Sequence, residues 1–213
     1  MQLIASKKQG NMKRTLTKTT DRIIANCQTA WLLQATRKQR KLGKLWYKDA
    51  QNFTKRLSKE YGIDRYIVAA ELAILSPNNP WERNKKDAES MIKAFVEGRS
   101  IDSFKVCTYN PNKRKAWGVL NGDTTLIAKS PKTHAFSMNI GRLSPKHVTV
   151  DKWHIRASLC KPKDGIVDTV ESLTAIQYRR VEAITARIAE EHKLKAYEAQ
   201  AIIWVTIKEA WNR

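Results

Sequence analysis

Cysteine is scarce and scattered in this chain of 213 residues. The three cysteines, Cys27, Cys107 and Cys160, form no CxxC pair, and the four histidines show no HxxxH spacing. A disulfide framework needs an even set of cysteines, and zinc sites use closely spaced Cys and His ligands. We therefore expect reduced thiols, no metal site and no bound cofactor.

Long apolar runs are also missing. The most apolar stretch, residues 66–75, is interrupted by Glu71, whereas a membrane-spanning helix needs about 18 or more apolar residues. The first five residues are too few for a signal-peptide core, and Lys7 and Lys8 follow them closely. We expect no membrane partner, a monomer, and a cytoplasmic location in a bacterial or phage-infected cell.

Acidic residues are few relative to basic ones. The chain has 40 Lys and Arg against 20 Asp and Glu, for a formal charge of +20. Such an excess is typical of a protein with a polyanionic partner, because cationic side chains displace the counterions of nucleic acids. A membrane-surface binder or a ribosome-associated protein is the alternative. Nucleic acid is favoured, because the basic residues are spread along the chain and not confined to one amphipathic helix.

Alternation typical of strands is rare, and helical periodicity is common. Apolar residues recur every three or four positions in residues 46–61, 67–74, 84–97, 181–188 and 197–211. Gly62 and Gly98 follow two of these stretches as expected stops. The pattern predicts an all-α protein.

The expected domain organisation is simple. Residues 1–20 are basic and aperiodic, which predicts a flexible arm, and residues 21–213 form one helical domain. With 42% apolar residues, this domain can bury a core as one compact unit or as two lobes with a shared cleft. Turns are expected at Asn110-Pro111 and Asn121-Gly122.

One amine and one carboxylate stand out by their local settings. Lys132 follows Pro131, which suits the first turn of a helix. Asp151 lies nineteen residues further on, after the β-branched run 148–150, at a position that predicts a helix N-cap. Two helix starts joined by the turn near Gly141 can bring Lys132 and Asp151 into one cleft.

These segments resemble the helix-hairpin-helix DNA base-excision glycosylases. Residues 126–133, LIAKSPKT, are similar to the family hairpin L-P-G-x-G-x-K-[TV]-A, and Val150-Asp151 is similar to its V-D-x-H segment. Residues 73–84, AILSPNNPWERN, resemble the segment whose polar side chain enters the DNA stack. The resemblance covers residues 66–159, with the helix-hairpin-helix region at about 115–160. The nineteen-residue spacing indicates a remote, phage-like member closest to the 8-oxoguanine DNA glycosylase branch.

The resemblance implies a two-lobed helical fold with a central cleft and a base-excision activity on double-stranded DNA. A damaged or modified base leaves the stack, and the enzyme cleaves its N-glycosidic bond. Lys132 attacks the sugar and leaves a Schiff base, which adds abasic-site lyase chemistry. Asp151 stays ionised and stabilises the cationic sugar. Burial of Lys132 and the neighbouring charge of Lys129 would favour the unprotonated amine.

The resemblance also suggests residues that contact DNA. Asn78 or Asn79 would fill the space that the base vacates, although the loop between Pro77 and Pro80 is equally typical of a plain turn. Lys129, Ser130 and His154 are the other candidate DNA contacts. For His154, support of Asp151 and a purely structural position are the alternatives. Phe136 and Trp204 are the candidates that stack on the base, and a core position is the alternative for both.

The chain departs from the family at two points. Ala128 and Ser130 stand where the hairpin has glycine, which changes the backbone freedom of its turn. One cysteine follows position 107, so the four-cysteine iron–sulfur loop of the endonuclease III branch is excluded. Two other functions stay open: a non-catalytic nucleic-acid-binding protein on the same scaffold, and a related phage enzyme that modifies bases.

Overall fold

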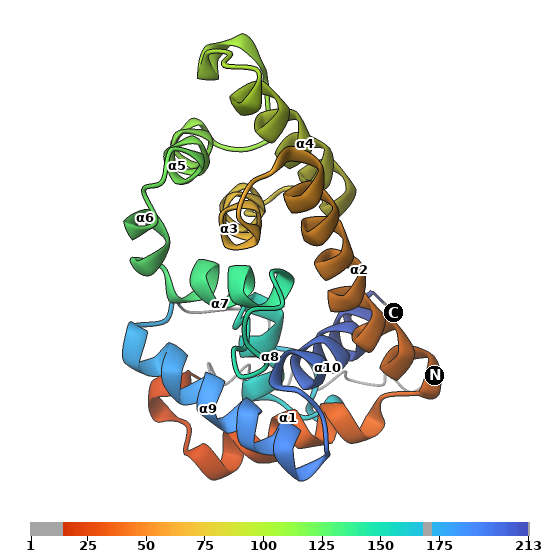
Figure 1. Cartoon of the computed structure of the whole chain (residues 1–213). Helices are drawn as coiled ribbons and strands as arrows, with labels where there is room; N and C mark the ends of the chain where they lie inside the picture. Colours follow the sequence, from red (N-terminus) through yellow and green to blue (C-terminus); the bar gives the residue numbers. More distant parts are fainter. Residues whose placement is uncertain (1–14, 168–171, 213) are drawn as a thin grey trace, which may run out of the picture.

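The computed structural model describes residues 15–167 and 172–212, and all regular structure in these two segments is helical (Figure 1). The prediction of an all-α protein is therefore confirmed. The α-helices are α1 (Asp21–Gln34), α2 (Arg37–Tyr61), α3 (Arg65–Leu75), α4 (Trp81–Val96), α5 (Asn110–Leu120), α6 (Thr125–Ala128), α7 (Pro131–Ile140), α8 (Lys152–Leu159), α9 (Ala175–Glu191) and α10 (Ala196–Trp211). Short 3-10 turns lie at Leu16–Lys18, Ile101–Ser103 and Pro162–Asp164.

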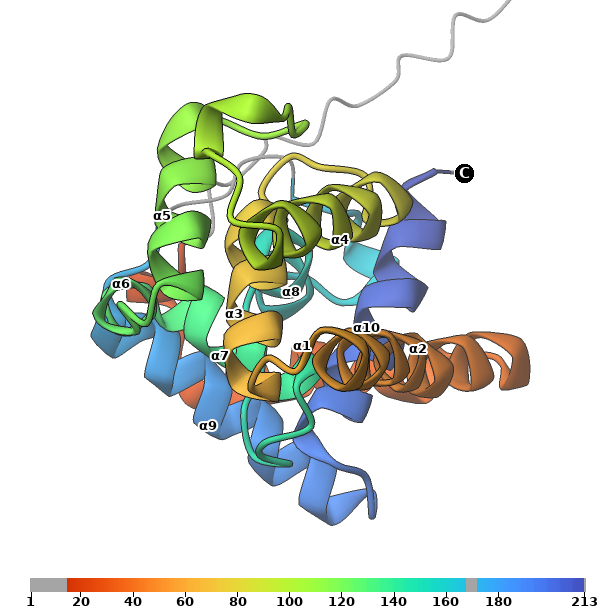
Figure 2. The ribbon, with the colours of Figure 1, turned by 45° about the horizontal axis from the view of Figure 1, so that its top comes forward.

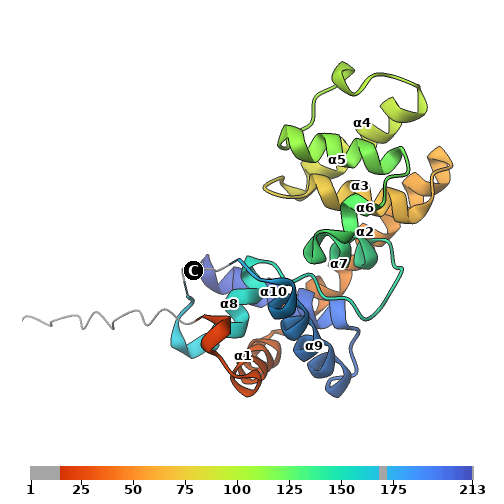
Figure 3. The same ribbon diagram turned by 90° about the vertical axis from the view of Figure 1, so that its left-hand side faces the viewer.

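The buried apolar side chains form two clusters. The first cluster surrounds α3 and draws residues from α2, α4, α5, α6 and α7. The second cluster joins α1, residues 148–150, α8 and α9. Helix α10 contributes to both clusters. Figures 1 and 3 show α3, α4 and α5 at one end of the molecule and α1, α8 and α9 at the other, with α7 between them.

Helix α2 begins nine residues earlier than the apolar periodicity predicts. Thr36 accepts a hydrogen bond from the backbone N–H of Gln39, whose side chain accepts one from the N–H of Thr36. This capping box starts the helix within a basic stretch that lacks apolar periodicity. Gly62, with φ of 67°, ends it as expected.

The long helix α2 packs closely against α10 at Gly43 (Figure 2). A Cβ atom on Gly43 would lie 2.7 Å from the Cα atom of Ile202, so no larger residue fits without a shift of the helices. One turn further along α2, the Trp46 ring comes within 6.4 Å of the Trp204 ring of α10, measured between centroids. The glycine thus sets the distance between two helices that carry large aromatic rings.

The predicted N-terminal arm, residues 1–20, extends too far, because its last six residues belong to the folded part of the chain. Leu16 is fully buried in the second cluster, and the carbonyl groups of Leu16 and Thr19 accept hydrogen bonds from Arg180 of α9. Residues 15–20 are therefore packed against the helical body. Residues 1–14 lie outside the described segments.

One of the two predicted turns is confirmed. Gly122 adopts φ of 94° directly after α5, in the left-handed region where glycine is favoured. Asn110-Pro111 instead begins α5, with the proline in the first turn. Proline loses nothing there, because the first N–H groups of a helix have no partner within it.

Candidate active site

A cavity of about 320 Å³ opens beside the first cluster and reaches residues 149–151, which include Val150 and adjoin Val148, both of the second cluster. Five parts of the chain line it: α2, the loop 76–80 with the start of α4, α7, residues 149–151, and α10. Its lining residues are Trp46, Tyr47, Ser76, Asn79, Pro80, Trp81, Lys132, Phe136, Thr149, Asp151, Gln200, Ala201, Trp204 and Lys208. The volume lies at the lower end of the usual range for small-molecule sites.

Asp151 occupies the predicted N-cap of α8, and its carboxylate is fully engaged by donors. One oxygen, Oδ1, accepts from the backbone N–H groups of Trp153 at 3.0 Å and His154 at 2.9 Å. The other, Oδ2, accepts from the Trp204 indole Nε1–H at 2.9 Å. Burial raises the pKa of Asp151, while these three hydrogen bonds and the charge of Lys132 act in the opposite direction. The carboxylate is thus held in a fixed orientation at the cavity wall.

Lys132 lies in the first turn of α7, as predicted, and lines the same cavity as Asp151. Its side chain is exposed, so the burial that we expected for this amine is not found. The charge of Lys132 acts on Asp151, but no ion pair within 4.0 Å joins these two described residues. The amine is therefore not locked in a salt bridge across the cavity.

Aromatic rings form one side of the cavity. The Trp46 ring lies 5.1 Å from the Trp81 ring and 6.0 Å from the Phe136 ring, measured between centroids. Phe136 and Trp204, the predicted stacking residues, both line this cavity. Trp46 and Trp81 were not predicted for the site. Trp46 fits the apolar face of an amphipathic helix, and in the segment 73–84 a role was expected for Asn78 or Asn79 alone. A flat, aromatic ligand suits such a wall.

Polar side chains form the floor of the cavity. The Tyr47 hydroxyl lies 2.9 Å from Gln200 Oε1 and 3.1 Å from Thr149 Oγ1, and Asn139 Nδ2 donates to the same Thr149 oxygen at 3.2 Å. The amide nitrogen of Gln200 has no hydrogen-bond partner among the described residues. Apolar periodicity did not indicate that Tyr47, Thr149 and Gln200 line a cavity, because the helix or segment that carries each of them also contributes buried apolar residues to a core cluster.

The structure separates the two asparagines of the loop 76–80. Asn79 lines the cavity, and its Nδ2 donates to Asp87 Oδ2 at 3.0 Å. Asn78 is exposed at the loop tip with φ of 58°, and its amide donates to the Tyr109 hydroxyl at 3.1 Å. Asn78 is thus the more accessible of the two, and Asn79 is anchored to α4.

Three further predicted DNA contacts do not line the cavity. Lys129 is exposed at the C-terminal end of α6, close to Lys132 in sequence. Ser130 caps α7, with its hydroxyl accepting from the Thr133 N–H at 3.4 Å. His154 is fully buried, and its Nε2 lies 2.8 Å from Thr185 Oγ1. A contact between the His154 side chain and a phosphate is incompatible with this burial, so that prediction is wrong. Its backbone N–H supports Asp151 instead.

Among the residues that the structure describes, no group of three or more His, Cys, Asp or Glu side chains is arranged to hold a metal ion. In the same two segments, no helix is long and apolar enough to cross a membrane.

The chain belongs to a family of unknown function, DUF7178, whose profile matches residues 7–211. No curated protein and no solved structure matches the chain.

Proposed function

We propose that this protein is a DNA base-excision glycosylase with Schiff-base chemistry, and a remote member of the helix-hairpin-helix glycosylases. The observation that carries this proposal is the meeting of Lys132 and Asp151 at one aromatic-walled cavity. Both come from segments that were singled out for their spacing, and each lies at the start of its own helix. An amine and a helix-capping carboxylate beside a pocket for a flat ring are what base excision requires.

The arrangement of the helices agrees with the two-lobed architecture that this proposal implies. In this proposal the two hydrophobic clusters are the cores of the two lobes, and the cavity is the central cleft. Helix α6 and the start of α7 would serve as the hairpin, with Lys132 just after it. The hairpin glycines are replaced at positions that need no left-handed backbone, because Ala128 is the last residue of α6 and Ser130 has φ of −126°.

The proposed reaction begins when the extruded base enters the cavity and lies against the aromatic side. The Lys132 amine, in its neutral form, attacks C1′ and forms a C–N bond as the glycosidic bond breaks. The base leaves with the bonding electron pair and takes the proton that the attacking nitrogen releases. The nitrogen lone pair then expels O4′, which takes a proton from solvent water, and a protonated Schiff base remains at C1′. Asp151, held by three donors, stabilises the positive charge that develops on the sugar.

The polar floor and the exposed loop supply two further roles. Gln200 presents an amide N–H₂ group that can donate to an acceptor on the base edge. Asn78, exposed at the tip of the loop 76–80, is the candidate that occupies the vacated position in the stack. Base extrusion costs a few kcal/mol, which a wedge and a fitted pocket offset.

Borohydride trapping tests the proposed nucleophile without knowledge of the target base. A duplex with an abasic site offers its aldehyde to the amine, and reduction converts the Schiff base into a permanent cross-link. We expect wild type to cross-link and Lys132→Ala to lose cross-linking, with DNA affinity nearly unchanged. Lys129→Ala is the matched control, since it removes an equal charge three residues away and leaves the cavity intact.

Each outcome of trapping has a clear meaning. Cross-linking by Lys132→Ala at the wild-type level would overturn the role of Lys132. No cross-link with wild type, together with tight DNA binding, would favour the non-catalytic nucleic-acid-binding protein or the base-modification enzyme.

The DNA partner is tested by the salt dependence of binding. Because the chain carries a net charge of +20, affinity for a duplex should fall steeply as salt rises. If about six to ten phosphates are contacted, the loss between 50 and 200 mM salt is roughly 10³- to 10⁵-fold. A titration by fluorescence anisotropy measures this, and a flat response would argue against a nucleic-acid partner.

A further inference from the structure

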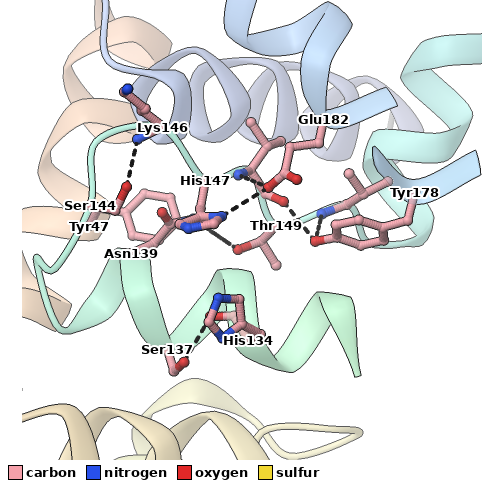
Figure 4. A network of polar contacts seen from close by, with 12 residues as sticks. Tyr47, His134, Ser137, Asn139, Ser144, Lys146, His147, Thr149, Tyr178 and Glu182 are labelled. Carbon is pink, nitrogen blue, oxygen red and sulfur yellow. Dashed lines mark hydrogen bonds and ion pairs between the residues drawn. The ribbon is translucent and has the colours of Figure 1, made fainter. Parts of the chain in front are cut away.

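The segment that carries Asp151, residues 147–151, has no regular secondary structure and ends the connection from α7 to α8 (Figure 4). Val148 is fully buried in the second cluster and Val150 is 3% exposed. Thr149 alternates with them and lines the cavity. The segment therefore separates a hydrophobic cluster from the candidate active site.

Buried backbone N–H and C=O groups outside a helix need hydrogen-bond partners, which a neighbouring strand often supplies. The described residues contain no such strand. Helix α9 supplies side chains instead. The Tyr178 hydroxyl donates to the Val148 carbonyl at 2.7 Å and accepts from the Val150 N–H at 3.1 Å. Glu182, one turn along α9, accepts from the Val148 N–H at 3.0 Å.

The double contact of Tyr178 is well suited to fix the backbone. Tyr178 is 5% exposed, and burial raises the pKa of its hydroxyl, which therefore keeps the proton that it donates to Val148. The hydroxyl oxygen of Tyr178 thus links the two peptide groups on either side of Thr149. Asp151 follows directly after Val150, the second of the two residues that Tyr178 holds. On the cavity side, the segment is held through the Thr149 side chain by Tyr47 and Asn139 (Figure 4).

We infer that Tyr178 is a positioning residue for Asp151: by pairing with the backbone of residues 148 and 150, it fixes the carboxylate where the sugar cation develops. The inference rests on the proposed function, because it assigns Asp151 a charge-stabilising role. Tyr178 is absent from the cavity lining, so it acts only through the segment. Glu182 supports the same segment one residue earlier, at its more accessible end.

Two duplexes that need no knowledge of the target base provide the test. One carries a pyrrolidine abasic analogue, whose protonated amine resembles the cationic sugar, and the other carries the neutral tetrahydrofuran analogue. The ratio of the two dissociation constants measures how well Asp151 is placed to stabilise positive charge. We expect wild type to prefer pyrrolidine by about a hundredfold, as transition-state analogues bind more tightly than neutral ones. Asp151→Asn should abolish this preference.

Tyr178→Phe removes the hydroxyl and keeps the buried ring. We expect its pyrrolidine preference to fall by about tenfold or more, with tetrahydrofuran affinity unchanged, because the charge partner is displaced and the DNA surface is not. Thr54→Val is the matched control. It also removes a buried hydroxyl, whose bond to the Ile140 carbonyl at 2.8 Å joins two helices away from the segment. Its melting temperature should fall and its preference should stay at the wild-type value.

The outcomes separate the inference from the proposed function. A wild-type protein without a pyrrolidine preference would refute the charge-stabilising role of Asp151, and the inference would fall with it. A clear wild-type preference that Tyr178→Phe retains would overturn the inference alone. Should Tyr178→Phe not fold, Glu182→Ala gives the same test: loss of preference is expected, and Glu182→Gln, which keeps an oxygen acceptor for Val148, should restore it.

Discussion

The two sides of the cavity differ in the chemistry that they contribute. The first cluster supplies a wall of rings, in which Trp46, Trp81 and Phe136 pack against one another. The side next to the second cluster supplies the carboxylate of Asp151 and the donors that hold it. Binding of a flat base and stabilisation of charge thus come from different regions. Some mutations should therefore impair base binding alone, and others charge stabilisation alone.

The largest effect is expected for Asp151→Asn. Asparagine caps helices about as well as aspartate, so the helix start is preserved. The substitution removes negative charge where the sugar becomes cationic, and base release should slow by about a hundredfold or more. Single-turnover kinetics on duplexes with a panel of damaged and modified bases measures this rate. Wild-type kinetics in the variant would reduce Asp151 to a structural cap.

The two clusters also differ in the ionisable group that each one buries. Glu71 in α3 is fully buried, with no hydrogen-bond partner for either oxygen, and burial raises its pKa well above the usual value. His154 in α8 is fully buried, and burial lowers its pKa to about 3. In both cases the neutral form is favoured. The consequences for stability run in opposite directions with pH.

The second prediction concerns the opposite ways in which Glu71 and His154 make the free energy of unfolding depend on pH. The folded state binds the Glu71 proton more tightly than the unfolded state, so stability is lost as pH rises above the unfolded pKa near 4.5. The unfolded state protonates His154 below about 6.5, so stability is lost as pH falls, by about 2 kcal/mol between pH 8 and pH 5. In denaturant unfolding, the free energy of unfolding of Glu71→Gln relative to wild type should increase as pH rises. That of His154→Gln relative to wild type should increase as pH falls. Parallel pH profiles for wild type and both variants would contradict this prediction.

The smallest effect is expected on the aromatic side. Trp81→Ala removes a ring from the wall, and stacking of one base is worth about 1–3 kcal/mol. Affinity for a duplex with a mismatched, easily extruded base should fall by about tenfold, with affinity for the tetrahydrofuran duplex unchanged. Trp117→Ala, which removes a ring packed on Phe95 and Phe104 away from the cavity, is the control. Equal losses of affinity for both duplexes would contradict a contact between Trp81 and the extruded base.

Local signals in the sequence were enough for much of the fold. Apolar periodicity predicts the helical class and the core helix around residues 67–74, and Gly62 and Gly98 mark helix ends. The start of α2 was missed, because its first turns are basic and its capping box carries no apolar repeat. Asn110-Pro111 was misread as a turn, since the same pair serves equally well in a first helical turn.

The candidate site was predictable only in part. Lys132 and Asp151 have local signatures, a proline before one and a β-branched run before the other, and the structure places both at one cavity. Trp46 and Gln200 have no such signature. Their place at the cavity follows from the close approach of α2 and α10 at Gly43, a contact between residues more than 150 positions apart. Periodicity within one helix cannot report on such a contact.

The composition of the two clusters has a consequence for the order in which the chain folds during synthesis. Most of the first cluster lies within residues 47–140, so it can assemble while the C-terminal third is still being translated. Leu16, Ile24 and Trp31 of the second cluster are made before the first cluster, yet their partners on α8, α9 and α10 are made after most of it. The apolar face of α1 therefore stays uncovered while most of the first cluster is being made. The bond from Trp204 to Asp151 closes only when α10 has left the ribosome, so the candidate active site is completed well after the first cluster can form.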